Sequence, residues 1–307
     1  MMTKFARNLA KKIGRQFVDP SRLEKIQESL GRIEASLNAA RPRGNPRDYE
    51  FKVYSQWGED GIIDHLVTRI AIPAHSRSFV EFGVENYTEA NTIFLLKHRY
   101  WRGLVIDGST ENIDTIKRST EYWRYDLRAD ASFITRDNIN SIISKNGLQG
   151  ELGLLSIDID GNDYWIWESI DCVNPCIVVA EYNSLFGPTA KLSTPYRPDF
   201  VRSMADPTNM YYGASIAALD HLAKSKGYSL VAGNSAGNNV FFVRDDLLGT
   251  LEKLTPQEAY VCAAFREAHS PEGEVLHLSF EERQAVIAHL PLVDVVSRAT
   301  TTLRAWL

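Results

Sequence analysis

Two apolar runs in the middle of the chain end in acidic residues, and this pattern restricts the fold more than any other feature. The runs are LLSIDIDGND (residues 154–163) and IVVAEYN (residues 177–183). An apolar run that ends in polar residues is typical of a buried parallel strand, which carries those residues to the carboxyl edge of an open sheet, where α/β proteins bind ligands. Asp158, Asp160 and Asp163 with Glu181 and Asn183 would form an all-oxygen set that suits a hard divalent cation.

Apolar runs of strand length alternate with helical patterns between residues 51 and 250, which predicts an α/β fold. Five strands separated by crossovers predict a doubly wound parallel sheet. The last two strands are joined only by SAGN (residues 235–238), so they should form an antiparallel hairpin and complete a seven-stranded, mostly parallel sheet. The expected strands are 78–84, 103–108, 132–136, 153–159, 176–182, 229–234 and 239–244, and the expected helices are 58–70, 89–99, 111–120, 137–146, 163–170 and 213–227.

Composition limits the possible class of protein. The chain has 307 residues, of which 44% are hydrophobic, and this is enough for one domain of about 200–250 residues with appendages. Its formal charge of −5 argues against nucleic acid as a main partner. Three cysteines match neither a disulfide framework nor zinc-finger spacing, so a reducing, cytoplasmic location is expected. The sequence has no apolar run of about 18 residues and no signal-peptide core.

The first 40 residues predict helices with two different patterns. Phe5, Leu9, Ile13 and Phe17 recur every four residues among lysines and arginines, which indicates a basic amphipathic helix over residues 1–20. Such a helix could hold the protein peripherally on the inner face of a membrane, and the alternative is a solvated helix that packs on a partner of its own.

Apolar residues of the next segment follow a heptad pattern. Spacings of three and four residues relate Leu23, Ile26, Leu30, Ile33 and Leu37. This pattern predicts a short coiled coil and a homo-oligomer, although two heptads are also compatible with a helix that docks on the globular domain. Residues 41–50 (RPRGNPRDYE) are then expected to be a linker. At the other end, residues 251–307 predict a helical extension with helices at 256–268, 280–290 and 297–306.

Several motifs lie where the strands of the sheet are expected to end. The first strand leads into FVEFGVENYTEANT (79–92), the second ends WRGLVIDGS (101–109) and the fourth ends IDIDGNDYW (157–165), with YSQWGED (54–60) upstream. With these motifs, residues 51–245 resemble class I S-adenosylmethionine-dependent methyltransferases, most closely the FkbM-type and related sugar O-methyltransferases. The resemblance implies S-adenosylmethionine as the cofactor.

The resemblance also implies cofactor contacts at the ends of the first four strands. Glu85 and Asn86 stand where that family usually has further glycines, so the expected cradle is altered. Alternatively, Asp107 or Asp137 would only cap the helix that follows it, and Gln56 would only bond to the backbone. The implied cofactor-binding residues are Gln56, Glu81, Gly83, Asn86, Asp107, Asp137, Asn138 and Asp158.

Metal-dependent members of the superfamily, such as catechol and macrolide sugar O-methyltransferases, suggest a role for the acidic residues. The resemblance implies that Asp160, Glu181 and Asn183 bind Mg²⁺ or Mn²⁺ and that Asp163, or else Asp158, is the general base. The two ligands after the fifth strand are usually adjacent in these enzymes, whereas here Tyr182 separates Glu181 from Asn183. These two side chains face the same side only if the chain remains extended. The alternative is that DGND is a turn in which Asp163 caps a helix.

The long segment 183–215 is expected to form an ordered lid over the acceptor. Tyr196, Arg197, Tyr211 and Tyr212 would suit a sugar or phosphate, unless the tyrosines serve only for packing. The sequence therefore predicts a metal-assisted O-methyltransferase that acts on a hydroxyl of a glycan or glycosylated product. Two alternatives stay open: a degenerate methyltransferase-like scaffold that oligomerises through its N-terminal helix, and another nucleotide-cofactor enzyme, although a G-x-G-x-x-G motif is missing.

Overall fold

The computed structural model describes residues 20–42, 44–263, 265, 268–270 and 273–306. The predicted amphipathic helix with Phe5, Leu9, Ile13 and Phe17 lies outside these residues. Within them, no helix combines the length and the apolar character needed to cross a membrane.

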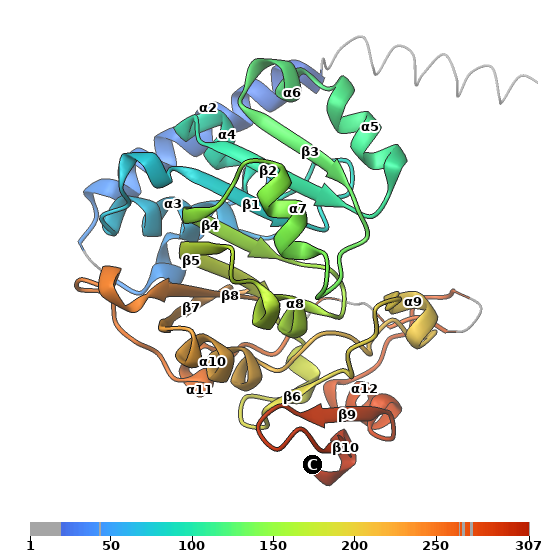
Figure 1. The fold of residues 1–307 in the computed structure, drawn as a ribbon. Helices are drawn as coiled ribbons and strands as arrows, with labels where there is room; N and C mark the ends of the chain where they lie inside the picture. Colours follow the sequence, from blue (N-terminus) through green and yellow to red (C-terminus); the bar gives the residue numbers. More distant parts are fainter. Residues whose placement is uncertain (1–19, 43, 264, 266–267, 271–272, 307) are drawn as a thin grey trace, which may run out of the picture.

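A seven-stranded sheet forms the centre of the described structure, in the order β3-β2-β1-β4-β5-β8-β7 (Figure 1). β1 to β5 are parallel to one another, and β8 lies antiparallel between β5 and β7. The predicted doubly wound, mostly parallel sheet with a terminal hairpin is therefore confirmed. Its strands are β1 (Ser78–Phe82), β2 (Arg102–Asp107), β3 (Leu127–Ala131), β4 (Gly150–Ile157), β5 (Val173–Glu181), β7 (Tyr228–Gly233) and β8 (Asn239–Arg244).

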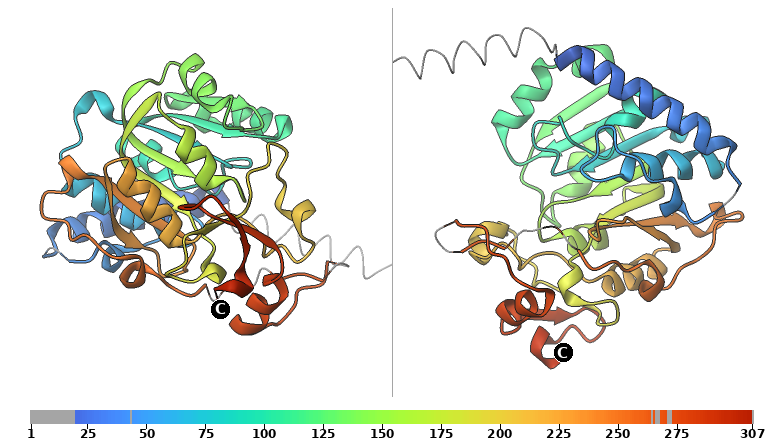
Figure 2. Two further views of the ribbon diagram at one scale, coloured as in Figure 1. Left: turned by 60° about the horizontal axis from the view of Figure 1, so that its bottom comes forward. Right: turned by 180° about the vertical axis from the view of Figure 1, so that it is seen from behind.

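Helices cover both faces of the sheet because the central strands are apolar on both sides. On one face, α3 (Glu59–Arg69), α4 (Ile93–Arg99) and α5 (Thr110–Arg118) share a hydrophobic core with the sheet. On the other face, α7 (Ile139–Lys145), α8 (Asp163–Ser169) and α10 (Ile216–Ser225) form a second core. The long helix α2 (Pro20–Ala40) runs along the outside of the first layer (Figure 2), and the short α6 (Thr120–Arg124) follows α5.

The third strand lies five residues earlier than predicted. The sequence favoured 132–136 (SFITR), whereas β3 is LRADA, paired with β2 from Gly103↔Leu127 to Asp107↔Ala131. An edge strand needs only one buried face, so the half-polar LRADA suffices. The more apolar residues that follow it therefore remain available at the carboxyl edge of the sheet.

Residues of the C-terminal segment pack against the segment 183–215. Leu185, Leu192 and Met210 share a small hydrophobic cluster with Leu292 and Leu303. Strands β6 (Leu192–Ser193), β9 (Pro291–Asp294) and β10 (Thr300–Thr302) join the two segments in a second sheet, seen at the bottom of Figure 1. The same region contains α9 (Arg202–Ala205) and α12 (Phe280–Ile287).

Two of the three predicted C-terminal helices need correction. The helix expected at 297–306 is instead β10 followed by the 3₁₀ turn η5 (Leu303–Ala305), because consecutive β-branched threonines favour a strand when a partner is present. Of the helix expected at 256–268, the described residues form only α11 (Pro256–Ala259). By contrast, α12 occupies most of the predicted segment 280–290.

The predicted linker packs against the domain from residue 46 onwards. Residues of η1 (Pro46–Tyr49) contact the sheet: Arg47 donates to the carbonyl oxygens of Gly233 and Ala259, and the buried Tyr49 stacks on His65 at 3.6 Å. This segment therefore fixes where α2 joins the domain.

Candidate functional site

Two connected cavities open at the carboxyl edge of the sheet. The first, called here the apolar cavity, is lined by Ile106, Phe133, Ile134 and Phe200 among others. The second, called the acidic cavity, is lined by residues from β1, β2, β5 and β8, by the turn after β4 and by Gln56, among others. Both cavities include Gly83, Asp107, Asp158 and Asp160, so they form one continuous site at the point where the strand order reverses between β1 and β4.

Gly83 sits at this reversal with a positive φ of 66°. A Cβ atom there would lie 1.8 Å from the carbonyl oxygen of Asp158, so any other residue would push β1 and β4 apart. Glu85 and Tyr87 also have positive φ, whereas the side chain of Asn86 accepts hydrogen bonds from the Thr88 amide and hydroxyl. The turn is thus tightened by residues on both sides of Asn86.

Asp107 connects this turn to the end of β2. Its Oδ2 atom accepts from the Glu85 amide at 2.8 Å, and its Oδ1 atom accepts from the Ser109 amide and from Asn112 Nδ2. A carboxylate offers about four acceptor positions, so these three bonds leave room for about one more donor. Asp107 therefore both organises the turn and faces the two cavities.

Residues after β3 contribute an apolar wall. Ser132, Phe133 and Ile134 line the apolar cavity, whereas Asp137 is exposed and lines neither cavity. The side chain of Asn138 donates to the Phe133 carbonyl and accepts from the Thr135 amide, so it shapes this wall from behind. The prediction missed residues 132–134 because it placed the strand itself there.

Three carboxylates gather at the ends of β4 and β5. Oxygen atoms of Asp158, Asp160 and Glu181 all lie within 4.8 Å of one another. Arg202 from α9 pairs with Asp160 at 2.8 Å and lies over the ring of Tyr212, 3.5 Å from its centroid. Burial, together with the negative charge of the neighbouring carboxylates, raises the pKa of Asp158 and of Glu181 well above the ordinary range.

Asp163 lies behind the turn that carries Asp160. Its two carboxylate oxygens accept from the Ile159 and Gly161 amides at 2.9 and 3.0 Å. The residue is fully buried, and burial raises its pKa to about 6. It lines neither cavity, and its hydrogen bonds hold the turn in which Asp160 has a φ of 58°.

Asn183 does not join the carboxylates. Its amide nitrogen donates to the carbonyl oxygens of Met210 and Tyr212, and its side-chain oxygen accepts from the Leu185 amide at the start of η3 (Ser184–Phe186). The strand ends at Glu181, so the two-residue alternation that would have put residues 181 and 183 on one side does not apply. Asp158 takes the third place in the cluster instead.

The four predicted acceptor-binding residues are absent from the described lining of both cavities. Tyr196 accepts from the Arg136 amide, and the exposed Arg197 pairs with Asp199. The Tyr211 hydroxyl donates to the Pro291 carbonyl, while Tyr212 supports Arg202. The segment 183–215 contributes Phe200 and Arg202 to the cavities, and these two residues were not predicted.

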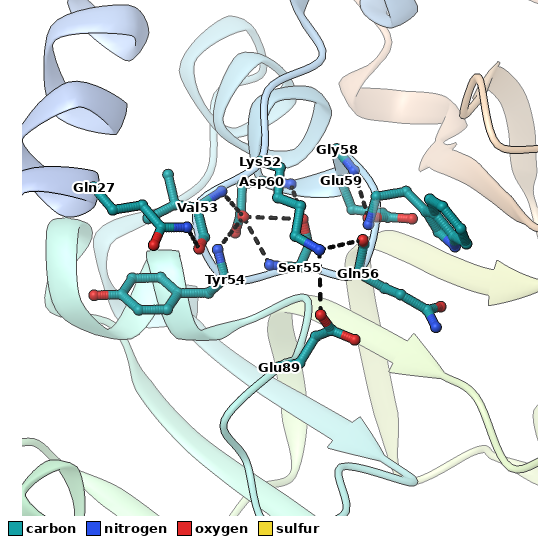
Figure 3. Close-up of polar contacts among 11 residues, drawn as sticks. Gln27, Lys52, Val53, Tyr54, Ser55, Gln56, Gly58, Glu59, Asp60 and Glu89 are labelled. Carbon is teal, nitrogen blue, oxygen red and sulfur yellow. Dashed lines mark hydrogen bonds and ion pairs between the residues drawn. The ribbon is translucent and has the colours of Figure 1, made fainter. Parts of the chain in front are cut away.

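Residues 52–60 form a tightly hydrogen-bonded segment (Figure 3), and its Gln56 lines the acidic cavity. Asp60 Oδ2 accepts from three successive amides, those of residues 53–55, and from the Ser55 hydroxyl. Lys52 Nζ donates to the Gln56 carbonyl and pairs with Glu89 at 3.2 Å. These contacts fix the backbone of Gln56, which lines the cavity.

Glu81, the last acidic residue before the Gly83 turn, is fully engaged by the protein. Its carboxylate accepts from the Asn91 amide and from the amide and hydroxyl of Thr92, and lies 3.4 Å from the Ser156 hydroxyl. Burial nevertheless raises its pKa to about 7, since the hydrogen bonds offset only part of the desolvation. Through these contacts, Glu81 of β1 connects the loop before α4 with β4.

No protein-family model matches the chain, and no curated protein matches it. Similar solved structures include an O-methyltransferase from Bacillus cereus in complex with SAH (12% identity, 77% of this chain and 97% of that chain, TM-score 0.41). The N-terminal domain of EvdMO1 with SAH bound is 11% identical over 74% of this chain and 97% of that chain (TM-score 0.40). The CcbJ methyltransferase from Streptomyces caelestis is 12% identical over 68% of this chain and 95% of that chain (TM-score 0.37). At such identities and TM-scores a shared activity does not follow.

Proposed function

We propose that this protein transfers a methyl group from S-adenosylmethionine to a hydroxyl oxygen of a glycan or glycosylated product, assisted by a divalent cation. The observation that carries the proposal is the continuous site from Asp107 and Phe133 to the cluster of Asp158, Asp160 and Glu181. An acid at the end of β2 and an apolar wall after β3 suit a ribose and an adenine, and the motifs that resemble methyltransferases contribute to this same edge.

The residues of the acidic cavity fit a cation. Three carboxylate oxygens converge, and the Oε2 atom of Glu181 has no hydrogen-bond partner among the described residues. Burying a charged oxygen without a donor is costly, and a hard cation would offset that cost. Asp158, Asp160 and Glu181 would hold the cation, which would lower the pKa of a bound acceptor hydroxyl.

Each part of the site then has a separate task in methyl transfer. Residues of the apolar cavity such as Phe133 and Asp107 would hold S-adenosylmethionine, which would supply an electrophilic methyl carbon for the acceptor oxygen and would leave as S-adenosylhomocysteine. Asp158 lines both cavities beside the proposed cation site, which places its carboxylate to accept the hydroxyl proton. Asp163 holds the turn of Asp160, while Phe133 and Phe200 would keep water away from the apolar cavity.

A degenerate scaffold is the second candidate, and two observations favour it. Asp107 already accepts three hydrogen bonds from the protein, and Glu85 occupies the turn where a glycine would open space for a ligand. Such a protein would keep the fold without binding the cofactor.

Thermal unfolding with S-adenosylhomocysteine, with and without Mg²⁺ or Mn²⁺, separates these functions. A ligand at 100 times its dissociation constant stabilises the native state by about 2.7 kcal/mol, so the melting temperature should rise clearly. A further rise with the metal would support the cation. If folded protein shows no rise at saturating ligand, the scaffold is the better description, and a rise with NAD alone would indicate a different nucleotide enzyme.

A further inference from the structure

Asn239, the first residue of β8, lies beside Glu181 in the acidic cavity. The two residues are direct partners in the antiparallel pairing of β5 and β8, so their side chains share one face of the sheet. Both line the cavity, and both are buried, with exposed fractions of 4% and 6%. Nothing in the sequence motifs pointed to Asn239, because it belongs to the hairpin rather than to a parallel strand.

The orientation of the Asn239 amide is set by Glu59. Its Nδ2 atom donates to Glu59 Oε1 at 2.9 Å, and the same oxygen accepts from Asn234 Nδ2 at 2.7 Å. An ionised carboxylate only accepts hydrogen bonds, so the amide cannot be reversed without losing this bond. The Asn239 Oδ1 atom is therefore the end that is left for the cavity.

This amide oxygen and the neighbouring carboxylate share an unusual property. Neither Asn239 Oδ1 nor Glu181 Oε2 has a hydrogen-bond partner among the described residues, although both atoms are buried. Most buried polar atoms in proteins are paired, and an orphan needs an explanation. Two orphaned acceptors on adjacent strands, beside Asp158 and Asp160, indicate a ligand that supplies positive charge.

We propose that Asn239 Oδ1 is a fourth protein ligand of the divalent cation, together with Asp158, Asp160 and Glu181. The inference rests on the proposed function, because it assumes the cation, and it adds a residue from a different strand. An uncharged amide oxygen is a usual ligand of Mg²⁺, Mn²⁺ and Ca²⁺, and it completes an oxygen set without more negative charge.

Glu59 becomes a positioning residue in this arrangement. Its second oxygen, Oε2, accepts from the Trp57 and Gly58 amides in the loop shown in Figure 3. The loop therefore holds Glu59, and Glu59 holds the Asn239 amide with its oxygen free. Outer partners of this kind orient metal ligands and tune their affinity.

Isothermal titration of the full chain with Mn²⁺ tests the proposal without any activity assay. Asn239→Ala removes the oxygen and should weaken the Mn²⁺ dissociation constant at least about tenfold. Asn239→Asp is the matched control: it loses the same bond to Glu59 but keeps an oxygen, so its Mn²⁺ affinity should stay within about threefold of wild type or increase. Circular dichroism establishes that each variant is folded.

The outcomes distinguish the inference from the function on which it rests. If wild type binds Mn²⁺ and both Asn239 variants weaken binding alike, the residue acts only through Glu59 and the inference is wrong. If Asn239→Ala binds normally, the inference is also wrong, while the three-carboxylate site stands. If wild type binds no Mn²⁺, both the cation and the inference fail. Should Asn239→Asp not fold, Asn239→Ser, which also keeps an oxygen, replaces it as the control, and its Mn²⁺ affinity should exceed that of Asn239→Ala; equal affinities of the two variants would overturn the inference.

A second feature, independent of the cavity, is the outer face of α2. The five heptad residues Leu23, Ile26, Leu30, Ile33 and Leu37, called here the α2 seam, are 53–63% exposed. A neighbouring face of the helix is docked: a Cβ atom on Gly31 would lie 2.3 Å from Val53, and Ala35 is buried. The helix therefore packs on the domain through one face and exposes an apolar stripe on another.

We infer that the α2 seam binds the α2 seam of a second copy of this chain. Five side chains of this exposure from each copy would together bury about 1,000 Å², which is close to the lower limit for a specific interface. The e and g positions that flank such a seam carry only two charged residues, of opposite sign, so two copies would bring no like charges together in a parallel or an antiparallel pair. These positions hold Arg22, Ser29, Ser36, Gln27 and Glu34. No entropy of helix formation opposes the pairing, because the domain already holds the helix.

Sedimentation equilibrium of the full chain at micromolar concentrations tests this inference. Wild type should dimerise, and Leu30→Glu should weaken the dimer at least about tenfold while leaving the fold intact, because the side chain is exposed. Met204→Glu, which changes an exposed apolar residue outside the seam, is the control and should dimerise like wild type. A monomeric wild type would overturn the inference, and so would Leu30→Glu that still dimerises. Binding of wild-type monomers to anionic vesicles would identify a membrane as the occupant instead.

Discussion

Two glutamates near the carboxyl edge, Glu81 in β1 and Glu181 at the end of β5, have nearly the same burial but different surroundings. Both are over nine-tenths buried, and burial raises the pKa of both. Glu81 accepts hydrogen bonds from the loop before α4, whereas Glu181 Oε2 has no partner among the described residues and faces other acids. Burial and a raised pKa therefore do not identify a functional residue by themselves; Glu181 differs from Glu81 in having an unpartnered oxygen that faces a cavity and two other carboxylates.

The largest expected effect is that of Glu181→Gln. The variant removes a proposed cation ligand, so activity with S-adenosylmethionine should fall by at least about 100-fold. It also removes repulsion from Asp158 and Asp160, so the metal-free protein should gain about 1 kcal/mol, or about 2–4 °C in melting temperature. Differential scanning calorimetry without metal checks the gain. A less stable variant with normal activity would make Glu181 a structural residue like Glu81.

The pH dependence of stability should separate the two glutamates next. The pKa of Glu81 rises from about 4.5 to about 7 on folding, so the folded state binds the proton more tightly. Its contribution to the free energy of unfolding is present in full below about pH 4.5 and is lost, about 3 kcal/mol in all, as the pH rises to about 7.

Urea unfolding between pH 4.5 and 7 measures this loss, with and without Mg²⁺. Titration of Asp158 and Glu181 changes the free energy of unfolding in the same direction. A bound cation should suppress the contribution of these two residues and leave that of Glu81 unchanged. A pH dependence that Mg²⁺ abolishes completely would mean that Glu81 does not titrate as described.

Glu81→Gln should cost about 2 kcal/mol near neutral pH. Its NH₂ group would face the backbone amide of either Asn91 or Thr92, which also donates, and that amide would lose its acceptor. Chemical denaturation gives the free energy of unfolding, and Mn²⁺ affinity measured on the folded variant should match wild type. If the variant lost Mn²⁺ binding without losing stability, Glu81 would be part of the cation site rather than a structural residue.

Asp163→Asn should have the smallest effect and places a third buried acid in the comparison. Like Glu81, Asp163 accepts from backbone amides, so the change should cost about 1–2 kcal/mol and lower activity only several-fold, through the turn of Asp160. The pH profile of kcat would keep its shape. A flattened acidic limb would instead show that Asp163 is the general base.

The sequence predicted those parts of the site that depend on strand order. Asp158, Asp160 and Glu181 meet because neighbouring parallel strands end at one edge, which hydrophobic runs alone reveal. Asn183 could not be placed, because whether the chain stays extended after Glu181 depends on contacts with Met210 and Tyr212 far along the chain. Asn239 was invisible for a similar reason, since Glu59, which orients it, is distant in sequence.

Helix α2 shows the same limit from another side. Heptad spacing identified its apolar residues, and we expected them either to pair with another copy or to dock on the domain. In the structure a different face docks, and the heptad residues stay exposed. The docked face is made of small and polar residues such as Gly31 and Asn38, which carry little hydrophobic signal. Which face meets the domain is decided by the shape of the surface around Val53 and Tyr49.

The second sheet has a consequence for how the protein is made. β6 gains its strand partner only when β9 (Pro291–Asp294) has been synthesised, long after β1 to β5. Phe200 and Arg202 lie in the segment between β6 and β7, so their wall of the site depends on that late pairing. On the ribosome, the sheet that carries the acidic cluster can fold before β9 has emerged, whereas the wall that Phe200 and Arg202 add to the cavities is completed only afterwards.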